Sequence, residues 1–305
     1  MLALVTAADT PGRVVAAEIA MPPVGPSDVL IRVRAAAVNP GDIVATHTLE
    51  AGNVPGWVAA GVVEQSAADG SGPAVGTPVV SLSVAGAWAQ YRSAPTTLVA
   101  KLPEGISFGA AATLFIHGGT ALRALRDLDV PPGGTVLITG ANGGVGRFAV
   151  QLAASAGHRV YATVRAGADE SEVRSLGAVD VLRSPAEAPV PLDGVIDVVG
   201  GPTLVEAFRR LDAGGTVISV GRASAQPSTF DAEDFQGAGG RHGRSIRTFY
   251  LDDGRPGLAQ DIEVLAAQVA AGELTMRTLP EVTAFAAVEQ LKDGTFDADR
   301  VISFI

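Results

Sequence analysis

A glycine-rich segment near the middle of the chain constrains the fold most strongly. An apolar, strand-like run ends on Gly140, and an amphipathic stretch follows from Gly144. Gly140, Gly143 and Gly146 are spaced three residues apart, a variant of the strand–turn–helix fingerprint of dinucleotide-binding proteins. We expect the amides of Gly143, Gly144 and Val145 to face a diphosphate, helped by the positive end of the helix dipole. The alternative is a tight turn without a ligand.

Two other glycine motifs do not match. A nucleotide triphosphatase loop needs Gly-Lys followed by Ser or Thr, and this chain has Gly146, Arg147 and Phe148. A nucleophile elbow of the form Gly-x-Ser-x-Gly does not occur in the sequence. The glycine spacing therefore fits a dinucleotide-binding turn better than either of these motifs.

Apolar strands alternate with amphipathic helices on both sides of this turn, which predicts an α/β domain with a doubly wound parallel sheet. Before about residue 109 the chain has short apolar runs separated by Pro, Gly and Asp, which predicts a β-rich domain. The Ser-, Gly- and Pro-rich segment 223–244 is expected to be a mobile loop. The expected strands are 135–139, 159–164, 179–182, 194–199, 215–220 and 245–250, and the expected helices are 144–156, 169–176 and 203–211.

Composition excludes several classes of partner and site. The formal net charge of −10 disfavours nucleic acid and anionic membrane surfaces. The sequence has no cysteine and its four histidines lack ligand spacing, so we expect no metal site. The start of the chain lacks the pattern of a secretory signal, and the uncharged segment 105–122 suits a buried turn and helix better than a membrane span. We therefore expect a cytoplasmic protein.

The end of the second predicted strand indicates which coenzyme is preferred. Rossmann sites for the unphosphorylated coenzyme place Asp or Glu there, to accept hydrogen bonds from the ribose. This chain has Thr163, Val164 and Arg165 instead. A guanidinium without a neighbouring carboxylate suits a 2′-phosphate, so NADPH is favoured over NADH. Arg165 could also be a solvated loop residue.

Six segments, in this order, resemble the medium-chain dehydrogenase/reductase superfamily, in particular its zinc-independent quinone oxidoreductase branch, typified by zeta-crystallin. They are VLIRVRAAAVNPGD, PGWVAAGVV, GAWAQYRSAP, KLPEGISFGAAATL, VLITGANGGVGRFAVQLA and SLGAVDVL. The resemblance implies a GroES-like β-rich catalytic domain formed by residues 1–112 and 250–305, and a Rossmann NADP-binding domain formed by residues 113–249.

The same resemblance implies roles for individual residues. Asn39 would help to frame the nicotinamide and the substrate, and Thr120 would contact the nicotinamide end of the coenzyme. Taken alone, Asn39 could be a turn residue before Pro40, and Thr120 a helix cap. The remaining crevice residues implied are Val199, Gly200, Val220, Gly221 and Arg222.

The chain departs from the family pattern at two places. Val58 stands where relatives usually carry an acidic or polar residue, and Phe115–His117 replaces the usual Pro-Leu-Ala. His117 could approach the nicotinamide or be a buried, hydrogen-bonded histidine. His47, shortly after Asn39, is a candidate proton donor or an ordinary loop histidine.

Three functions are compatible with this sequence. The first is NADPH-dependent reduction of a quinone or another electron-poor enone, which is mainly a matter of positioning and needs no metal. The second is reduction of a 2-enoyl thioester or a polyketide-type intermediate, for which a proton donor would help. The third is NADPH binding without turnover. Trp57, Trp88, Phe115 or Phe235 could contact an apolar acceptor, and a homodimer is implied by resemblance, through the edge strand 245–250.

Overall fold

The computed structural model describes residues 1–304, and the chain divides into two compact units. The first unit comprises Met1–Ile116 and Gly254–Ile305, and the second comprises His117–Asp253. The expected division lay at 112/113 and 249/250. The first unit is GroES-like and rich in β-structure, and the second is a Rossmann-like α/β unit.

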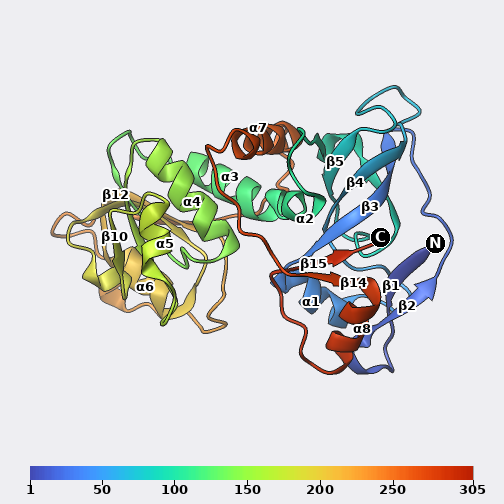
Figure 1. Cartoon of the computed structure of the whole chain (residues 1–305). Helices are drawn as coiled ribbons and strands as arrows, with labels where there is room; N and C mark the ends of the chain where they lie inside the picture. Colours follow the sequence, from blue (N-terminus) through green and yellow to red (C-terminus); the bar gives the residue numbers. More distant parts are fainter. Residues whose placement is uncertain (305) are drawn as a thin grey trace. The chain divides into compact units, whose positions relative to one another are not determined.

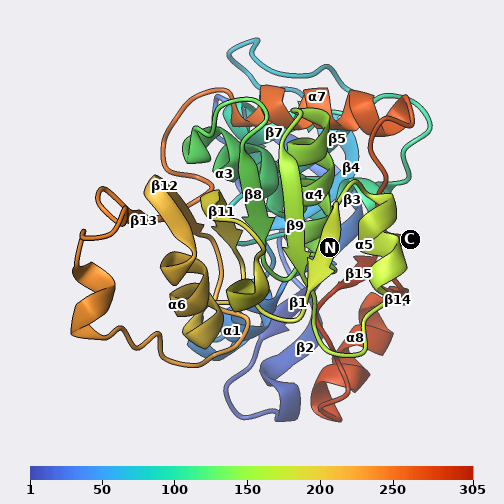
Figure 2. The ribbon, with the colours of Figure 1, turned by 90° about the vertical axis from the view of Figure 1, so that its left-hand side faces the viewer.

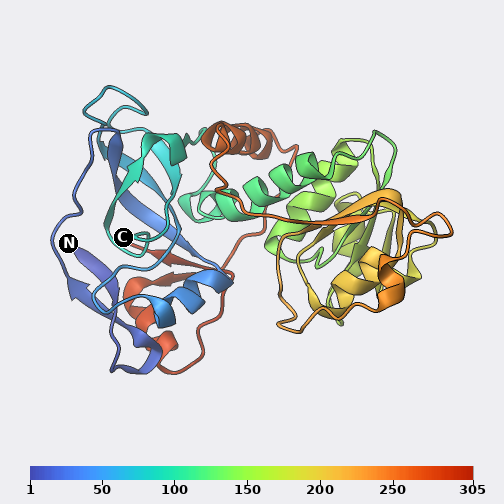
Figure 3. The same ribbon diagram turned by 180° about the vertical axis from the view of Figure 1, so that it is seen from behind.

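Both ends of the chain contribute to the first unit. Strand β15 pairs antiparallel with β3, so that Val301 lies opposite Ala37. Figure 3 shows these C-terminal strands beside the N-terminal strands of the same unit. In the described residues the larger sheet has the order β14-β15-β3-β4-β5-β7, with β6 on β3, and β1 and β2 form a separate pair. The strands are β1 (Leu2–Thr6), β2 (Val14–Glu18), β3 (Asp28–Val38), β4 (Val58–Gln65), β5 (Pro78–Leu82), β6 (Tyr91–Pro95), β7 (Val99–Lys101), β14 (Glu281–Thr283) and β15 (Arg300–Ser303).

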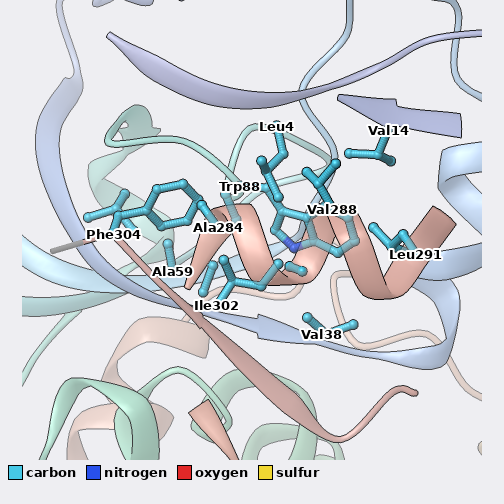
Figure 4. Packing of buried hydrophobic residues seen from close by; sticks show 14 residues of the cluster. Leu4, Val14, Val38, Ala59, Trp88, Ala284, Val288, Leu291, Ile302 and Phe304 are labelled. Atoms are coloured by element: carbon cyan, nitrogen blue, oxygen red, sulfur yellow. The ribbon is translucent and has the colours of Figure 1, made fainter. Parts of the chain in front are cut away.

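A buried tryptophan organises the core of this unit. Trp88 is fully buried, and Figure 4 shows its ring among Leu4, Val288 and Ile302, which come from both ends of the chain. Helix α8 carries Val288 and so covers this core. Removing the C-terminal strand or α8 would therefore expose the centre of the first unit. The helices of the unit are α1 (Pro40–Thr48), α2 (Phe108–Ala111), α7 (Leu258–Ala270) and α8 (Ala284–Lys292).

The second unit is built on a parallel sheet with the order β10-β9-β8-β11-β12-β13 (Figure 2). Each predicted strand and helix of this unit is present, although several ends differ. The largest difference is β12, which begins at Leu211 because Leu211 pairs with Leu192 before the register shifts. The elements are α3 (Thr120–Leu128), β8 (Thr135–Ile138), α4 (Gly144–Ser155), β9 (Arg159–Thr163), α5 (Glu170–Ser175), β10 (Asp180–Leu182), β11 (Leu192–Asp197), α6 (Gly201–Arg209), β12 (Leu211–Ser219) and β13 (Ser245–Thr248).

Helices cover this sheet as βαβ connections require. Helices α3 and α4 pack on each other and against the central strands, and α6 packs against β12. In Figure 1 these helices surround the strands of the second unit. The central strands β8 and β11 are consequently buried along most of their length, as their runs of branched residues predict.

The segment expected to be a mobile loop is anchored by side chains. Arg209 of α6 donates to Asp234 at 2.7 and 2.8 Å and to Asp231 at 2.7 Å. The rings of Phe208 and Phe230 meet edge to face at 5.6 Å, and Arg244 lies over Phe208 at 4.6 Å. The segment thus has little regular structure, yet it is attached to α6 by ion pairs and aromatic packing.

In residues 1–304 no helix combines the length and the apolar character that crossing a membrane would require. The uncharged stretch around residue 115 instead forms the short α2 and a π-helical turn, Leu114–Gly119, which leads into α3. Leu114 and Phe115 in this turn are fully buried.

Candidate functional site

Each glycine of the β8–α4 turn is required, or tolerated, for a different physical reason. Gly140 has φ +61°, and a Cβ there would lie 2.6 Å from Val198 Cγ2. A Cβ on Gly146 would lie 2.4 Å from the Gly140 carbonyl oxygen. Gly140 therefore serves the turn itself, and Gly146 serves the close packing of α4 on the turn.

Gly143 is the glycine that leaves space. A Cβ there would meet one atom within 4 Å, the Gly140 carbonyl oxygen at 3.3 Å. The Gly143 amide, however, donates to that same oxygen at 3.0 Å and so has an acceptor within the chain. Gly144 and Val145 are the first two helical residues of α4, whose amides have no acceptor inside a helix. These two amides are the donors that the turn offers to an anion.

At Gly144 a side chain would meet the imidazole of His117. A Cβ on Gly144 would lie 2.3 to 2.4 Å from three atoms of the His117 imidazole, Cε1, Nδ1 and Nε2. The imidazole thus packs directly on the first residue of α4. His117 belongs to the π-helical turn that leads into α3, and Thr120, the first residue of α3, is buried. The structure therefore locates His117 beside the glycine-rich turn.

A buried carboxylate connects the ends of the two central strands. Asp197, at the end of β11, accepts a 2.6 Å hydrogen bond from Thr139 Oγ1, just beyond β8. It also accepts bonds from the amides of Val199 at 3.3 Å and Gly200 at 2.9 Å. Thr139 Oγ1 in turn accepts from the Val198 amide at 3.0 Å. Burial raises the pKa of Asp197, and these hydrogen bonds oppose the rise.

The same residue aligns the next strand end through its main chain. The amides of Val220 and Gly221, beyond β12, donate to the Asp197 carbonyl oxygen at 2.8 and 3.2 Å. A Cβ on Gly221 would lie 2.7 Å from the carbonyl oxygen of Val198, so the two loops touch. The expected crevice residues Val199, Gly200, Val220 and Gly221 are thus brought together, and Arg222 beside them is exposed.

Arg165 lies on the exposed loop after β9, two residues beyond the buried Thr163. Its main-chain amide donates to Asn142 Oδ1 at 3.4 Å, and Asn142 belongs to the glycine-rich turn. The Thr163 carbonyl accepts from the Ala141 amide at 2.9 Å. The loop that carries Arg165 is therefore attached to the turn at the start of α4.

In the first unit, Asn39 is held by a carboxylate one helical turn away. Asn39 is buried and caps α1, and Pro40 is the first helical residue. Asp42 Oδ2 accepts from the Asn39 main-chain amide at 2.7 Å and from Asn39 Nδ2 at 3.0 Å. The Asn39 side chain is consequently fixed in direction.

Asp42 is itself buried beside a buried arginine. Burial raises the pKa of Asp42 to about 6, although its hydrogen bonds and the charge of Arg92 lower it. Burial likewise lowers the pKa of Arg92 to about 10, and Asp42 opposes that shift. Arg92 donates to the carbonyl oxygens of Trp57 at 3.0 Å and Ala85 at 3.1 Å. Asp42 and Arg92 thus form a buried pair of opposite charges, and each also forms hydrogen bonds with the main chain.

His47 is separated from Asn39 by the length of α1. It lies in the last turn of the helix and is exposed, whereas Asn39 caps the first turn. Eight residues at the helical rise correspond to roughly 12 Å. The structure therefore does not bring His47 to Asn39.

Two pairs that organise the site were missed from the sequence: Asp42 with Arg92, and Thr139 with Asp197. Asn39 and Asp42 match the capping-box spacing, which could have revealed that pair. Their places, one just beyond β8 and one at the end of β11, could have suggested Thr139 and Asp197. Arg92, in the short strand Tyr91–Pro95, gave no local signal of its partner.

Among residues 1–304, no group of three or more His, Cys, Asp or Glu side chains is disposed to hold a metal ion.

Comparison with known families matches both units. The model of the alcohol dehydrogenase GroES-like domain matches residues 25–104, and that of the zinc-binding dehydrogenases matches residues 144–265. The first match lies within the first unit, and the second covers most of the second unit and continues to residue 265 of the first.

Relatives of several kinds are similar to this chain. It is 32% identical over 279 residues to the pikromycin polyketide synthase component PikAII of Streptomyces venezuelae, covering 87% of this chain and 7% of that protein. It is 32% identical to the mitochondrial enoyl-[acyl-carrier-protein] reductase of Xenopus tropicalis, covering 67% of this chain and 64% of the relative. It is 34% identical to a probable quinone oxidoreductase of Schizosaccharomyces pombe, covering 56% and 55%. The chain thus spans less than two thirds of each.

A solved structure agrees over the whole chain. The mycobacterial protein Rv1454c, determined in complex with NADPH, is 25% identical and has a TM-score of 0.84, with both chains covered completely. The two family matches, their order and this common fold lead to one conclusion: the chain belongs to the medium-chain dehydrogenase/reductase superfamily.

Proposed function

We propose that this protein is an NADPH-dependent oxidoreductase that reduces a quinone or another electron-poor enone without a metal ion. The observation that carries the proposal is the turn between β8 and α4. Gly143 leaves room for a ligand, and Gly144 and Val145 lie at the start of a twelve-residue helix. These residues fit the diphosphate of a nicotinamide coenzyme. Val199, Gly200, Val220, Gly221, Arg222 and Thr120 would line the rest of its site.

Arg165 supports NADPH as the coenzyme. It is exposed where β9 ends, its loop is attached to the glycine-rich turn through Asn142, and no carboxylate lies between Thr163 and Ala168. A guanidinium in this place would bind a 2′-phosphate by charge-assisted hydrogen bonds. The NADPH complex of the similar mycobacterial protein is consistent with this assignment.

Asn39 is the residue that would frame the nicotinamide and the acceptor. When bound, NADPH supplies a hydride, and a quinone that accepts it together with one solvent proton becomes a hydroquinone. Asn39 would orient the reacting groups, because Asp42 holds its side chain in one direction. Exclusion of water and alignment are then the main contributions of the chain.

The surroundings of Asn39 favour a quinone as acceptor. On α1, Asp42 is occupied as an acceptor for Asn39 and Trp57, and His47 lies at the other end of the helix. A quinone can take its proton from solvent, so this helix need not supply a proton donor. An enoyl thioester must receive a proton at its α carbon, for which a positioned donor would help.

Reduction of an enoyl thioester is the second candidate. The similarity to mitochondrial enoyl reductase, over 225 residues, is the observation that favours it. His117, which packs on Gly144 beside the coenzyme turn, is a titratable side chain that could contribute there.

A comparison of acceptors tests the proposal. Purified protein is supplied with NADPH and either a quinone series (menadione, benzoquinone) or an enoyl series (crotonyl-CoA, octenoyl thioesters), and loss of NADPH absorbance is followed. We expect kcat/KM to be higher for the quinones. A preference for the thioesters would support the second candidate instead. Tight NADPH binding without consumption in either series would refute both and leave a coenzyme-binding protein.

A further inference from the structure

The two peptide groups that flank Trp57 are each held by a buried charged side chain. Its N–H donates to Asp42 Oδ1 at 3.1 Å, and its carbonyl accepts from Arg92 Nη1 at 3.0 Å. Asp42 and Arg92 are 0% and 1% exposed, so the charged partner in each of these hydrogen bonds is shielded from water. The main chain at Trp57 therefore has little freedom to change direction.

The same carboxylate fixes Asn39. Asp42 uses Oδ2 for both Asn39 hydrogen bonds and Oδ1 for Trp57. One side chain thus sets the positions of a polar residue and an aromatic residue relative to each other. A fixed polar and aromatic pair of this kind is how small-molecule sites orient a flat ligand.

The indole of Trp57 lies on the first turn of α1. A Cβ on Gly41 would lie 2.0 Å from Trp57 Cη2 and 2.8 Å from Cζ3. The ring therefore packs against the bare Cα of Gly41, two residues after Asn39. The residue as a whole is half-buried, so part of its surface is left for a ligand.

The other aromatic candidates do not share these properties. Trp88 and Phe115 are fully buried, and Trp88 lies inside the core of Figure 4. Phe235 belongs to the second unit, where its ring packs against Phe208 and Phe230. Trp57 is the one of the four that is both partly accessible and attached to the network holding Asn39.

We propose that Trp57 is the specificity-determining wall of the acceptor site, on which the planar ring of a quinone stacks beside Asn39. This inference rests on the proposed function and narrows its substrate class to ring acceptors. Offset stacking of aromatic rings contributes enough to change affinity by roughly threefold to tenfold. The enoyl chain of a linear thioester has no ring to stack at the reacting end and gains little from the indole.

Fluorescence quenching tests this binding mode without turnover. The chain has two tryptophans, so Trp57→Phe leaves Trp88 as the only indole, and Trp88→Phe leaves Trp57. The protein is saturated with NADP⁺, which cannot reduce the probe, and is titrated with menadione, a quinone that quenches indole emission. We expect saturable quenching in the wild type and in Trp88→Phe, and only weak, linear quenching in Trp57→Phe.

Trp88→Phe alters the core, so the comparison does not depend on it. The quenching of the wild type minus the quenching of Trp57→Phe gives the contribution of Trp57 from two proteins with an intact core. Saturable quenching that is undiminished in Trp57→Phe would overturn the proposal, whatever the activity. This readout stays informative if no acceptor is turned over, so its failure is distinct from failure of the proposed function.

Steady-state kinetics supply the second measurement. Trp57→Ala should raise KM for menadione roughly threefold to tenfold and leave KM for crotonyl-CoA within about twofold, while Trp57→Phe should restore most of the menadione KM. A merely structural role would impair both acceptors alike. Equal losses for both acceptors, without rescue by phenylalanine, would therefore contradict the assignment.

Discussion

One carboxylate oxygen of Asp42 accepts two hydrogen bonds from Asn39, at 2.7 Å from the main-chain amide and 3.0 Å from Nδ2. In Asp42→Asn one of the two carboxylate oxygens becomes an NH₂ group, which cannot accept, so the Asn39 or the Trp57 contact is lost. We expect kcat/KM with menadione to fall about tenfold, since a buried donor left unpaired costs on the order of 1–3 kcal/mol. Asp69→Asn, which removes an exposed carboxylate, is the matched control. Wild-type kinetics for Asp42→Asn would contradict the positioning role.

The pH dependence of stability should carry the signature of Asp42. Burial raises the pKa of Asp42 from 3.8 to about 6 in the folded chain. Between about pH 4 and pH 6 the folded state keeps a proton that the unfolded state has released, so this group's contribution to the free energy of unfolding falls as pH rises. It is fully present below about pH 4 and is lost above about pH 6.

Urea unfolding of the wild type and Asp42→Asn at several pH values between 4 and 7.5 measures this contribution by difference, because the other groups cancel. The wild type should lose stability relative to the variant as pH increases through this window. The ionised Asp42 carboxylate accepts hydrogen bonds from the Asn39 amide, Asn39 Nδ2 and the Trp57 amide. Reductase activity should therefore rise as pH increases toward 6 and above, opposite to the change in stability. A constant stability difference across the window would show that Asp42 titrates normally.

The contact between His117 and Gly144 predicts a rescue. Gly144→Ala places a methyl group inside the imidazole, which should lower stability by roughly 1–3 kcal/mol and weaken coenzyme binding. The double variant His117→Ala, Gly144→Ala removes the obstacle and should recover both properties. Calorimetric titration with NADPH and thermal unfolding provide the measurements.

Gly146→Ala is the control for this prediction. Its obstacle is the Gly140 carbonyl oxygen, which belongs to the main chain, so His117→Ala should not rescue it. Gly144→Ala could instead lower stability and coenzyme binding as much in the His117→Ala background as it does alone. In that case the geometry of the turn, and not His117, would explain why position 144 is a glycine.

Arg165 should discriminate between the two coenzymes. Arg165→Ala removes a charge-assisted contact to the 2′-phosphate, which NADH lacks. We expect Kd for NADPH to rise roughly tenfold or more and Kd for NADH to change less than about twofold. Arg241→Ala, another exposed loop arginine, controls for net charge. Equal weakening of both coenzymes would remove Arg165 from this role.

The edge strand β13 is the expected homodimer contact. It is at one edge of the parallel sheet, and Ile246 on it is 37% exposed. An apolar residue on an open strand edge is suited to pairing with a second copy. Light scattering should give twice the chain mass for the wild type, and Ile246→Lys should shift the protein toward monomer. A monomeric wild type at working concentrations would end this expectation.

The second unit was predictable because its signals are local. The turn at Gly140, the branched residues of β8 and β11 and the amphipathic α4 lie within short windows of sequence, which is where periodicity has meaning. The medium-chain resemblance then supplied the GroES-like unit, and the families matched at both units confirm it. Strand ends were less well predicted, as with β12, because pairing with Leu192 determines where that strand begins.

The site was less predictable because its contacts join distant parts of the chain. Arg92 reaches the carbonyl of Trp57, which no pattern around either residue discloses. Glycine spacing suggested that Gly143 and Gly144 act alike, whereas one leaves space and the other accommodates His117. The 223–244 segment has the composition of a mobile loop, and its attachment depends on Arg209 of a preceding helix.

Asp197 has a consequence for how ligands would be received. Its carboxylate and its main-chain carbonyl accept hydrogen bonds from residues just beyond β8, β11 and β12. If the loop after any one of these strands moved outward alone, a buried hydrogen-bonding group would lose its partner. A nucleotide that binds at this rim, formed by the loops after β8, β11 and β12, would therefore meet loops that already have their final arrangement. Little ordering entropy remains to be lost on association, and selectivity at this rim would come from shape rather than from rearrangement.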